Sequence, residues 1–203
     1  MQSKTKINFG SESFRKYFVN TSWMFAERVI KLLLSFFIGI FLVRYLGPDQ
    51  FGILSYAVSF ALLFASLANF GLDNILVREL VKFPEEQNTI LGSAFMLRVV
   101  GSAAVLIITW FAVQINNESD DVALLIYIIS AGTIFQAFHV IEFFFQGKVQ
   151  AKFSASVQSS SAMLASLFRL LMILLSGGLV WFAFIQALEP ILIAAGFVLV
   201  FTL

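Results

Sequence analysis

The sequence predicts an all-α integral membrane protein whose six apolar helices form one transmembrane bundle. Of its 203 residues, 60% are hydrophobic and only 12% are charged, and the mean hydropathy is +0.92. A soluble domain is closer to half apolar and a quarter charged. Six apolar runs of about 20–25 residues are each long enough to cross a bilayer as a helix. These runs are 22–46, 53–72, 90–114, 122–145, 154–176 and 179–203.

Several classes of site are excluded by residue types that the chain lacks. It contains no Cys and one His, so disulfides, thiol catalysis and thiolate metal sites are excluded. We find no metal-binding triad and no nucleophile–base pair, and we therefore expect neither an enzyme nor a bound metal or cofactor. The net charge of +1 gives no indication of nucleic-acid binding, and we expect no nucleic-acid partner.

The first apolar run follows a basic N-terminal segment and carries charges in its opening turns. Because the run is long and lacks a small-x-small cleavage site, we interpret it as an uncleaved first span and not as a secretory signal. At helical spacing, Glu27, Arg28 and Lys31 fall on one face. Ser35 and Gly39 continue this polar stripe on a helix that is otherwise compatible with lipid.

Short connections with helix-stop signals separate the spans. Gly47-Pro48 ends the first span, because the glycine is typical of a helix C-terminus and the proline cannot continue the helix. The segment 116–121 reads N-N-E-S-D-D and predicts a solvated loop, and 176–178 reads S-G-G and predicts a tight turn.

Two connections contain more structure. The segment 73–83 starts with a good N-cap pair and ends before Pro84, which predicts a short helix. Leu76, Val77, Leu80 and Val81 share one face of this helix, so we expect it to lie at the membrane interface. The segment 146–153, Q-G-K-V-Q-A-K-F, predicts a basic elbow between spans four and five.

The lysines and arginines outside the spans predict the orientation of the bundle. Eight of them stand in the N-terminal segment and in the connections after spans two and four: Lys4, Lys6, Arg15, Lys16, Arg78, Lys82, Lys148 and Lys152. The connections after spans one, three and five hold at most one such residue, Arg44 at the end of the first run. This asymmetry predicts that the N-terminus and the even-numbered connections are cytoplasmic.

Apart from Arg44 at the end of the first run, seven charged residues stand inside the apolar runs. The cations are Arg28, Lys31, Arg98 and Arg169, and the acids are Glu27, Glu142 and Glu189. A charge at the bilayer centre costs about 2.5–3.5 kcal/mol on insertion scales, so we expect these side chains to face the bundle interior. A cavity with more cations than acids suits a phosphate or diphosphate head group. Candidate hydrogen-bond partners for a sugar are Gln136, Gln146, Gln158, Ser154, Ser156, Ser159, Ser160 and Ser161.

The four cations also have structural interpretations. Lys31 and its i,i+4 neighbour Glu27 can simply neutralise each other. Arg28 and Lys31 can extend to the inner interface, and Arg169 to the outer one. For Arg98, which stands deeper in its span, we favour a place in the cavity wall.

The remaining ionisable residues are candidates for energy coupling or for a polar network with Glu27. His139 and Glu142 stand at i,i+3 on span four, so they share a face. They form either an inter-helix hydrogen-bond pair or a proton or ligand site. Glu189 has no predicted charge partner and precedes Pro190, which should kink the sixth span.

A family resemblance is carried by the loops around the second span. Residues 44–52 read R-Y-L-G-P-D-Q-F-G, and residues 70–79, one span later, read F-G-L-D-N-I-L-V-R-E. In these motifs the chain resembles the Wzx-like polysaccharide flippases of the multidrug/oligosaccharidyl-lipid/polysaccharide exporter superfamily. The later spans match by pattern only, including the arginine in span three and the Q-G-K-x-x-A-K elbow. The specific matching positions are Arg44, Leu46, Gly47, Phe51, Gly52, Gly71 and Arg78.

The resemblance implies a fold of two six-helix bundles that face each other across a central cavity, related by an axis along the membrane normal. Residues 1–203 then correspond to the N-terminal bundle, and we expect a C-terminal bundle outside this sequence. The family moves undecaprenyl-diphosphate-linked oligosaccharides across the bacterial inner membrane by alternating access, for O-antigen, capsule or exopolysaccharide assembly. The resemblance thus implies lipid-linked oligosaccharide, membrane lipid and the polysaccharide polymerase machinery as partners. It implies Arg28, Lys31 and Arg98 as diphosphate contacts.

Other functions fit part of the pattern. A cation-coupled multidrug exporter of the same superfamily needs an acidic cavity, and Glu27 and Glu189 keep this alternative open. A membrane polymerase or ligase needs reactive groups on an outer loop, and the outer connections here are short. A purely structural membrane subunit does not account for charges at one depth on several helices.

Overall fold

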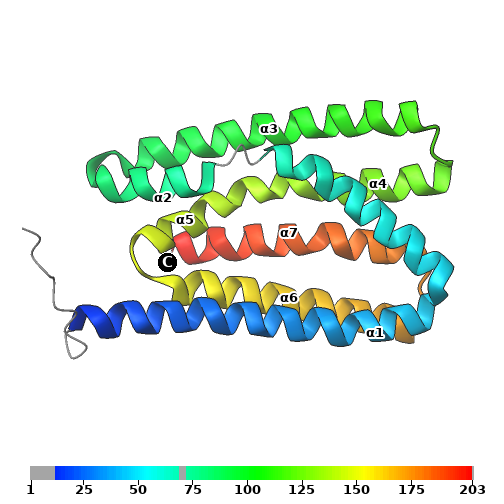
Figure 1. Cartoon of the computed structure of the whole chain (residues 1–203), viewed down its shortest axis with the longest axis horizontal. Coiled ribbons are helices and arrows are strands. Elements are labelled where there is room, and N and C mark those ends of the chain that lie inside the picture. Colours follow the sequence, from blue (N-terminus) through cyan, green and yellow to red (C-terminus); the bar gives the residue numbers. More distant parts are fainter. Residues whose placement is uncertain (1–11, 69–71, 203) are drawn as a thin grey trace, which may run out of the picture.

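The computed structural model describes residues 12–68 and 72–202, and every regular element in them is helical. The helices lie roughly along one common axis (Figure 1). Five of them are long and apolar enough to cross a membrane, which confirms the prediction of a helical, polytopic membrane protein. Some predictions concern residues outside the described ranges. These residues are Lys4, Lys6, Gly71 and Leu203.

The first two predicted spans are the two arms of one interrupted helix, α1 (Glu12–Ala68). The backbone leaves helical geometry at Gly47, where φ is 73° and ψ is 169°, a combination that is close to exclusive to glycine. Pro48 follows, and its fixed φ suits the first turn of the second arm. The chain reverses direction at this point (Figure 1). The five apolar helices therefore count the two arms of α1 as a single helix. That each arm crosses the membrane separately stays a prediction.

The short helix predicted over 73–83 is present as α2 (Leu72–Lys82), and its place at the membrane interface stays a prediction. Of the predicted apolar face, Leu76 and Leu80 are buried, whereas Val81 is 60% exposed. The two leucines pack in one cluster with Val140 of the fourth span. This contact holds α2 against the bundle.

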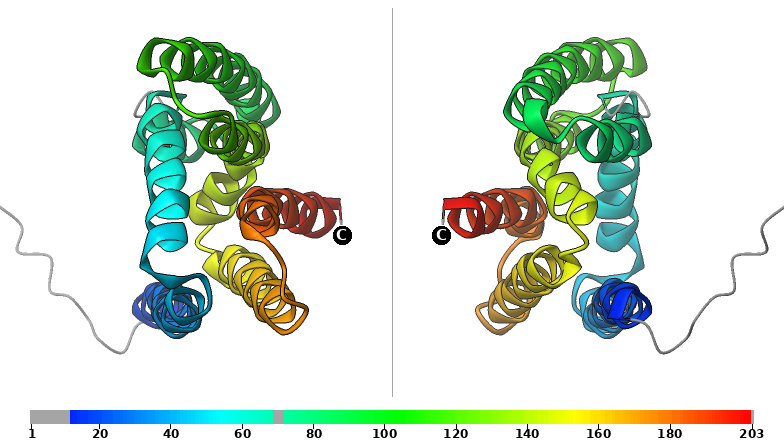
Figure 2. Two further views of the ribbon diagram at one scale, coloured as in Figure 1. Left: turned by 90° about the vertical axis from the view of Figure 1, so that its right-hand side faces the viewer. Right: turned by 90° about the vertical axis from the view of Figure 1, so that its left-hand side faces the viewer.

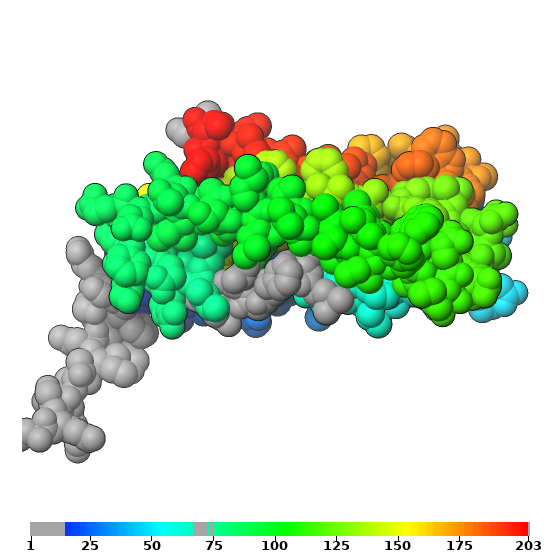
Figure 3. All heavy atoms as spheres, turned by 90° about the horizontal axis from the view of Figure 1, so that it is seen from above, coloured from blue at the N-terminus to red at the C-terminus, as the bar shows by residue number. Residues whose placement is uncertain are grey.

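A 3-10 turn, η1 (Pro84–Glu86), leads into α3 (Gln87–Asn116). Helix α3 runs along the bundle and forms one outer face for much of its length (Figure 3). Its bounds lie close to the predicted third span, 90–114. Its exposed side is apolar and includes Met96, Val100 and Ile107, which suits contact with lipid.

The fourth predicted span, 122–145, is one rod of three helical segments and not a uniform α-helix. It consists of α4 (Asp120–Gly132), the 3-10 segment η2 (Thr133–His139) and α5 (Val140–Gly147). A 3-10 segment of this length is uncommon, because its hydrogen bonds are poorer than those of an α-helix. In the end-on views this rod lies among the other helices (Figure 2).

Two side chains of α3 donate hydrogen bonds to carbonyl groups of η2. Ser102 Oγ donates to the carbonyl of Thr133 at 3.5 Å, and Arg98 Nη1 donates to that of Gln136 at 3.5 Å. In lipid each backbone carbonyl needs a partner inside the protein. These polar side chains of α3 therefore support the 3-10 geometry of its neighbour.

The last two spans are α6 (Ala151–Leu174) and α7 (Leu179–Thr202), close to their predicted bounds. Two close helix contacts depend on glycine. A Cβ at Gly132 would lie 2.8 Å from Cα of Ala187, and a Cβ at Gly196 would lie 2.7 Å from a methyl group of Val157. Close approach at small residues is typical of helices that pack within a membrane.

The bundle has two chemically different ends, the Gly47 end and the basic end. The Gly47 end holds Gly47, the α3–α4 connection and the α6–α7 turn. The basic end is the opposite one, where α1 starts and where α2 and the α5–α6 elbow lie (Figure 1). At the Gly47 end, Tyr45 Oη donates to the carbonyl of Gly177 at 3.0 Å, and Tyr56 hydrogen-bonds to Glu118. These two bonds tie both arms of α1 to the neighbouring connections.

Candidate functional site

A polar groove of about 590 Å³ lies between the two arms of α1 and helices α6 and α7. Three charged residues line it: Lys31 from α1, Arg169 from α6 and Glu189 from α7. Hydroxyl and amide groups from all of these elements add to its polar surface. They belong to Ser35, Ser55, Ser59, Ser166 and Gln186.

Arg169 and Glu189 form an ion pair across the groove wall. Arg169 Nη2 lies 3.0 Å from Glu189 Oε2 and donates to Gln186 Oε1 at 2.9 Å. Their side chains are 16% and 23% exposed, so both remain reachable from the groove. Glu189, which had no predicted partner, thus has a cation beside it. Arg169 is directed toward α7 and not only toward the outer interface.

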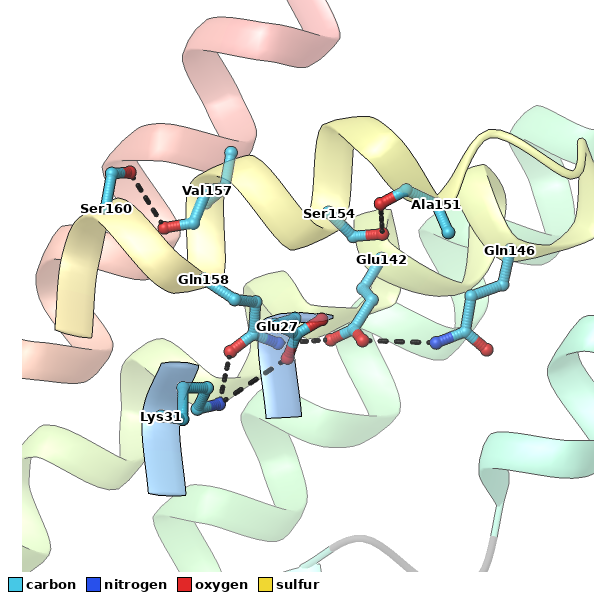
Figure 4. Close-up of polar contacts among 9 residues, drawn as sticks. All are labelled: Glu27, Lys31, Glu142, Gln146, Ala151, Ser154, Val157, Gln158 and Ser160. Atoms are coloured by element: carbon cyan, nitrogen blue, oxygen red, sulfur yellow. Dashed lines mark hydrogen bonds and ion pairs between the residues drawn. The ribbon is translucent and has the colours of Figure 1, made fainter. Parts of the chain in front are cut away.

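Lys31 is held by two groups on different helices, as Figure 4 shows. Its Nζ donates to Gln158 Oε1 of α6 at 2.9 Å and lies 3.8 Å from Glu27 Oε1, one turn earlier on α1. The Glu27 contact agrees with the structural interpretation of this i,i+4 pair. Because Lys31 also lines the groove, it can contact a ligand there as well.

Glu142 of α5 continues this network behind the groove (Figure 4). Gln158 Nε2 donates to Glu142 Oε2 at 2.8 Å, and Gln146 Nε2 donates to Glu142 Oε1 at 3.1 Å. The amide of Gln158 therefore bridges the ammonium group of Lys31 and the carboxyl group of Glu142. Through it, polar side chains of α1, α5 and α6 are linked in one chain of hydrogen bonds.

His139 does not take part in that network. Its Nε2 atom is buried and has no hydrogen-bond partner among the described residues. The ring packs edge-on against Phe197 of α7, with 6.1 Å between ring centroids. In the described part of the chain, Glu142 is hydrogen-bonded to glutamines. A role for His139 in proton or ligand binding stays a prediction.

Arg98 lies inside the bundle, apart from the groove. Its side chain is 4% exposed and forms an ion pair with Asp73 of α2. The guanidinium group also lies over the ring of Phe143, 5.1 Å from its centroid, and donates to the carbonyl of Gln136. The contacts of Arg98 thus connect α2, α3, η2 and α5.

Arg28 is exposed on the surface of α1 and is not among the groove-lining residues. Its neighbours Glu27 and Lys31 are both half-buried. The three residues therefore do not point the same way, although helical spacing places them on one broad face. Of the four predicted cations, the structure brings Lys31 and Arg169 to the groove and leaves Arg28 and Arg98 outside it.

The serines at the start of α6 mostly bond to their own helix. Ser154, Ser156 and Ser160 donate to the carbonyls of Ala151, Lys152 and Val157. Such bonds are the usual way a helix satisfies a hydroxyl group in an apolar setting. None of the five predicted sugar-binding serines lines the groove, whereas Ser166 does, two turns further along.

Two functional partners were not predicted from the sequence. Asp73 was interpreted as part of an N-cap, yet it pairs with Arg98. Gln186 stands at i,i+3 from Glu189, and both contact Arg169. A polar residue on the same face as an acid within an apolar span was the signal for Gln186. For Asp73, only three-dimensional proximity identifies the partner.

No group of three or more His, Cys, Asp or Glu residues that could hold a metal ion occurs in residues 12–68 and 72–202. Beside Glu189 and several apolar side chains, the groove offers two cations and a set of hydroxyl groups. Cations bind anionic oxygens through charge-assisted hydrogen bonds, and hydroxyls bind neutral polar groups. The groove therefore suits a ligand that carries both kinds of group.

Comparison with known proteins gives one match. The family model described as "Polysaccharide biosynthesis protein" matches residues 18–202, which is nearly the whole chain. Neither the curated proteins nor the solved structures include a match to this chain.

Proposed function

The chain belongs to the polysaccharide biosynthesis protein family, and from this membership we propose that it is a flippase for lipid-linked oligosaccharide. The substrate class is an undecaprenyl-diphosphate-linked oligosaccharide of the bacterial inner membrane, destined for O-antigen, capsule or exopolysaccharide. No bond is made or broken during transport. The diphosphate and sugar enter the groove while the polyprenyl chain stays in lipid.

The observation that carries this proposal is the convergence of Lys31 and Arg169 on one polar groove in an apolar bundle. Arginine binds phosphate oxygens through two parallel hydrogen bonds, and lysine supplies a compact positive charge. The surrounding hydroxyls of Ser35, Ser55 and Ser59 suit a sugar.

Substrate binding requires an exchange of partners within the groove. Arg169 is paired with Glu189, and Lys31 with Glu27 and Gln158. A diphosphate competes with Glu189 for Arg169 and frees the carboxyl group. The freed Glu189 then becomes available to a proton or a cation, which couples loading of the substrate to loading of the ion.

Alternating access needs a second wall for the groove. We propose that a second bundle faces this one, as the family resemblance implies, and that the two rock about the bound head group. The distribution of lysine and arginine predicts that the basic end is cytoplasmic. The groove then receives its substrate from the basic end and releases it toward the Gly47 end.

The test is made in the organism that carries the gene. The gene is deleted and supplied again as the full reading frame, either unchanged or with Lys31→Ala and Arg169→Ala together. The control carries Lys82→Ala and Lys148→Ala, which remove two exposed cations outside the groove. Surface polysaccharide, lipid-linked oligosaccharide on the cytoplasmic face and protein amount are measured in each strain.

We expect the groove variant to lose surface polysaccharide and to accumulate lipid-linked oligosaccharide at unchanged protein level. Each lost charge-assisted contact is worth about 1.5–3 kcal/mol, or roughly tenfold or more in binding. The control should resemble the unchanged gene. If the deletion strain has normal polysaccharide and no accumulated intermediate, the proposal is wrong. Drug susceptibility of that strain then tests the cation-coupled exporter.

A further inference from the structure

A second pocket, of about 530 Å³, lies at the basic end between the start of α1 and the α5–α6 elbow. It is separate from the groove and shares no lining residue with it. Three cations line it: Arg15 and Lys16 from α1 and Lys152 from α6. All three are exposed, and no acidic residue is among the lining residues. We call this pocket the elbow pocket.

One wall of the elbow pocket is held in place, because a hydrogen bond joins the α5–α6 elbow to α1. The backbone N–H of Ala151 donates to Asn20 Oδ1 of α1 at 2.7 Å. Val149 takes a positive φ of 55°, which is unusual for a β-branched residue. Strained backbone of this kind persists only where the surrounding structure holds it, and it gathers at binding sites. The strained turn and the Asn20 contact bring Lys152 to the same pocket as Arg15 and Lys16.

The floor of the elbow pocket is apolar. Val19 and Trp23 of α1 line it and are 48% and 44% exposed. Tyr17, two residues before Val19, is also exposed, at 60%. Tryptophan and tyrosine prefer the level of lipid head groups at a membrane surface. The pocket thus combines three cations with an exposed aromatic side chain.

We propose that the elbow pocket binds the phosphate group of an anionic phospholipid, with the acyl chains lying along Val19 and Trp23. The three cations match the charged head group, and the aromatic floor matches the boundary between head group and chains. A free phosphate ion matches only the first of these features. Trp23 lies about 12 Å along α1 from Lys31 at helical rise, so the lipid sits close to the groove without entering it.

Quenching of Trp23 fluorescence by brominated lipid tests this proposal. The chain contains three Trp, so Trp110→Phe and Trp181→Phe leave Trp23 as the single probe. The full chain is placed in phosphatidylcholine vesicles with small amounts of brominated phosphatidylglycerol or brominated phosphatidylcholine. We expect selective quenching by the anionic lipid. An attraction of this kind contributes about a fivefold preference for each cation near the surface.

Two matched variants separate the pocket from general surface charge. Arg15→Ala, Lys16→Ala and Lys152→Ala together should lower the preference for phosphatidylglycerol roughly a hundredfold if the three contributions multiply. The control changes three cations of the basic end that lie within the described residues and do not line the pocket, Arg78→Ala, Lys82→Ala and Lys148→Ala. It should keep the preference for phosphatidylglycerol. Lys152→Glu alone should lower the preference strongly. This single exposed change guards against misfolding of the triple variant.

Three results would overturn the proposal. The first is a preference that the pocket variants retain, and the second is an equal loss in the control. The third is full reversal by inorganic phosphate at the concentration of the anionic lipid, which identifies a site for free phosphate. Lipid binding is measured here without transport. The proposal that the elbow pocket binds lipid is therefore tested separately from the proposed flippase activity.

Discussion

Arg98 in the middle of α3 forms an ion pair with Asp73 at the start of α2. The arginine is 4% exposed and the aspartate 48%, so the pair joins the bundle interior to the surface at the basic end. The same guanidinium group donates to a carbonyl of the 3-10 segment η2. This arrangement assigns Arg98 to the cohesion of four helical segments, although its place in the sequence had favoured a cavity wall.

From this pair we predict that Asp73→Ala destabilises the protein. It leaves a buried guanidinium group without its carboxylate, which costs about 1–3 kcal/mol because one partner is half exposed. In an Arg98→Met background, the same Asp73→Ala change should cost much less. Thermal unfolding of the four proteins in detergent measures the coupling. Equal costs in both backgrounds would contradict a direct interaction.

Gly132→Ala should force α4 and α7 apart. The new Cβ would lie 2.8 Å from Cα of Ala187, and backbone cannot yield as a flexible side chain can. Overpacking of this kind costs about 1–3 kcal/mol. Gly92→Ala is the control, because a Cβ there meets nothing within 4 Å. We expect it to be neutral or stabilising by up to about 1 kcal/mol through helix propensity. Thermal unfolding compares the two, and a similar effect of both would contradict the close contact.

Gly47→Ala should weaken the reversal between the arms of α1 through backbone strain alone. No atom lies within 4 Å of a Cβ at this position, but φ is 73°. Conformations with positive φ and extended ψ cost non-glycine residues about 1–3 kcal/mol. Gly47→Asn should not rescue stability, because asparagine tolerates left-handed helical ψ and not the observed ψ of 169°. Gly52→Ala has equal space and no strain, and it should leave the unfolding temperature unchanged or raise it slightly through helix propensity.

Gln158→Leu should destabilise the network behind the groove. It removes the amide that accepts from Lys31 and donates to Glu142, and each stranded polar group costs about 1–3 kcal/mol. Gln158→Glu should also be harmful, because it sets a second carboxyl group against Glu142. Combined with Glu142→Gln, it should recover stability, since the carboxyl and amide groups then exchange places. Gln114→Leu, at an exposed glutamine, is the control for loss of a polar group.

The sequence predicted the helical architecture well because membrane spans follow from length and hydropathy. The bounds of α3, α6 and α7 lie within a few residues of the predicted spans. Composition could not predict that the fourth span contains η2. That geometry depends on donors from a different helix, Ser102 and Arg98. Likewise, the pattern of α2 grouped Leu76, Leu80 and Val81 on one apolar face but could not show that only the two leucines are buried.

The candidate site was harder to predict, because depth along a helix does not fix direction around it. Arg28 and Lys31 lie within one turn of each other, yet only Lys31 lines the groove. Arg98 occupies a comparable depth on a helix whose polar side faces other helices. The pairing of Arg169 with Glu189 requires knowing that α6 and α7 lie side by side. Spacing identifies the charged residues, and packing decides which of them share a cavity.

Because α1 is interrupted at Gly47, a rotation of the first arm about this residue would displace side chains far along that arm. Lys31 stands 16 residues before Gly47, which is about 24 Å at helical rise. A swing of about 10° at that point therefore displaces Lys31 by roughly 4 Å, more than the length of a hydrogen bond. Near the pivot the displacement is close to zero, where Tyr45 holds the adjoining turn. By this geometry, a small angular change at one glycine would be enough to separate Lys31, midway along the arm, from its partner Gln158.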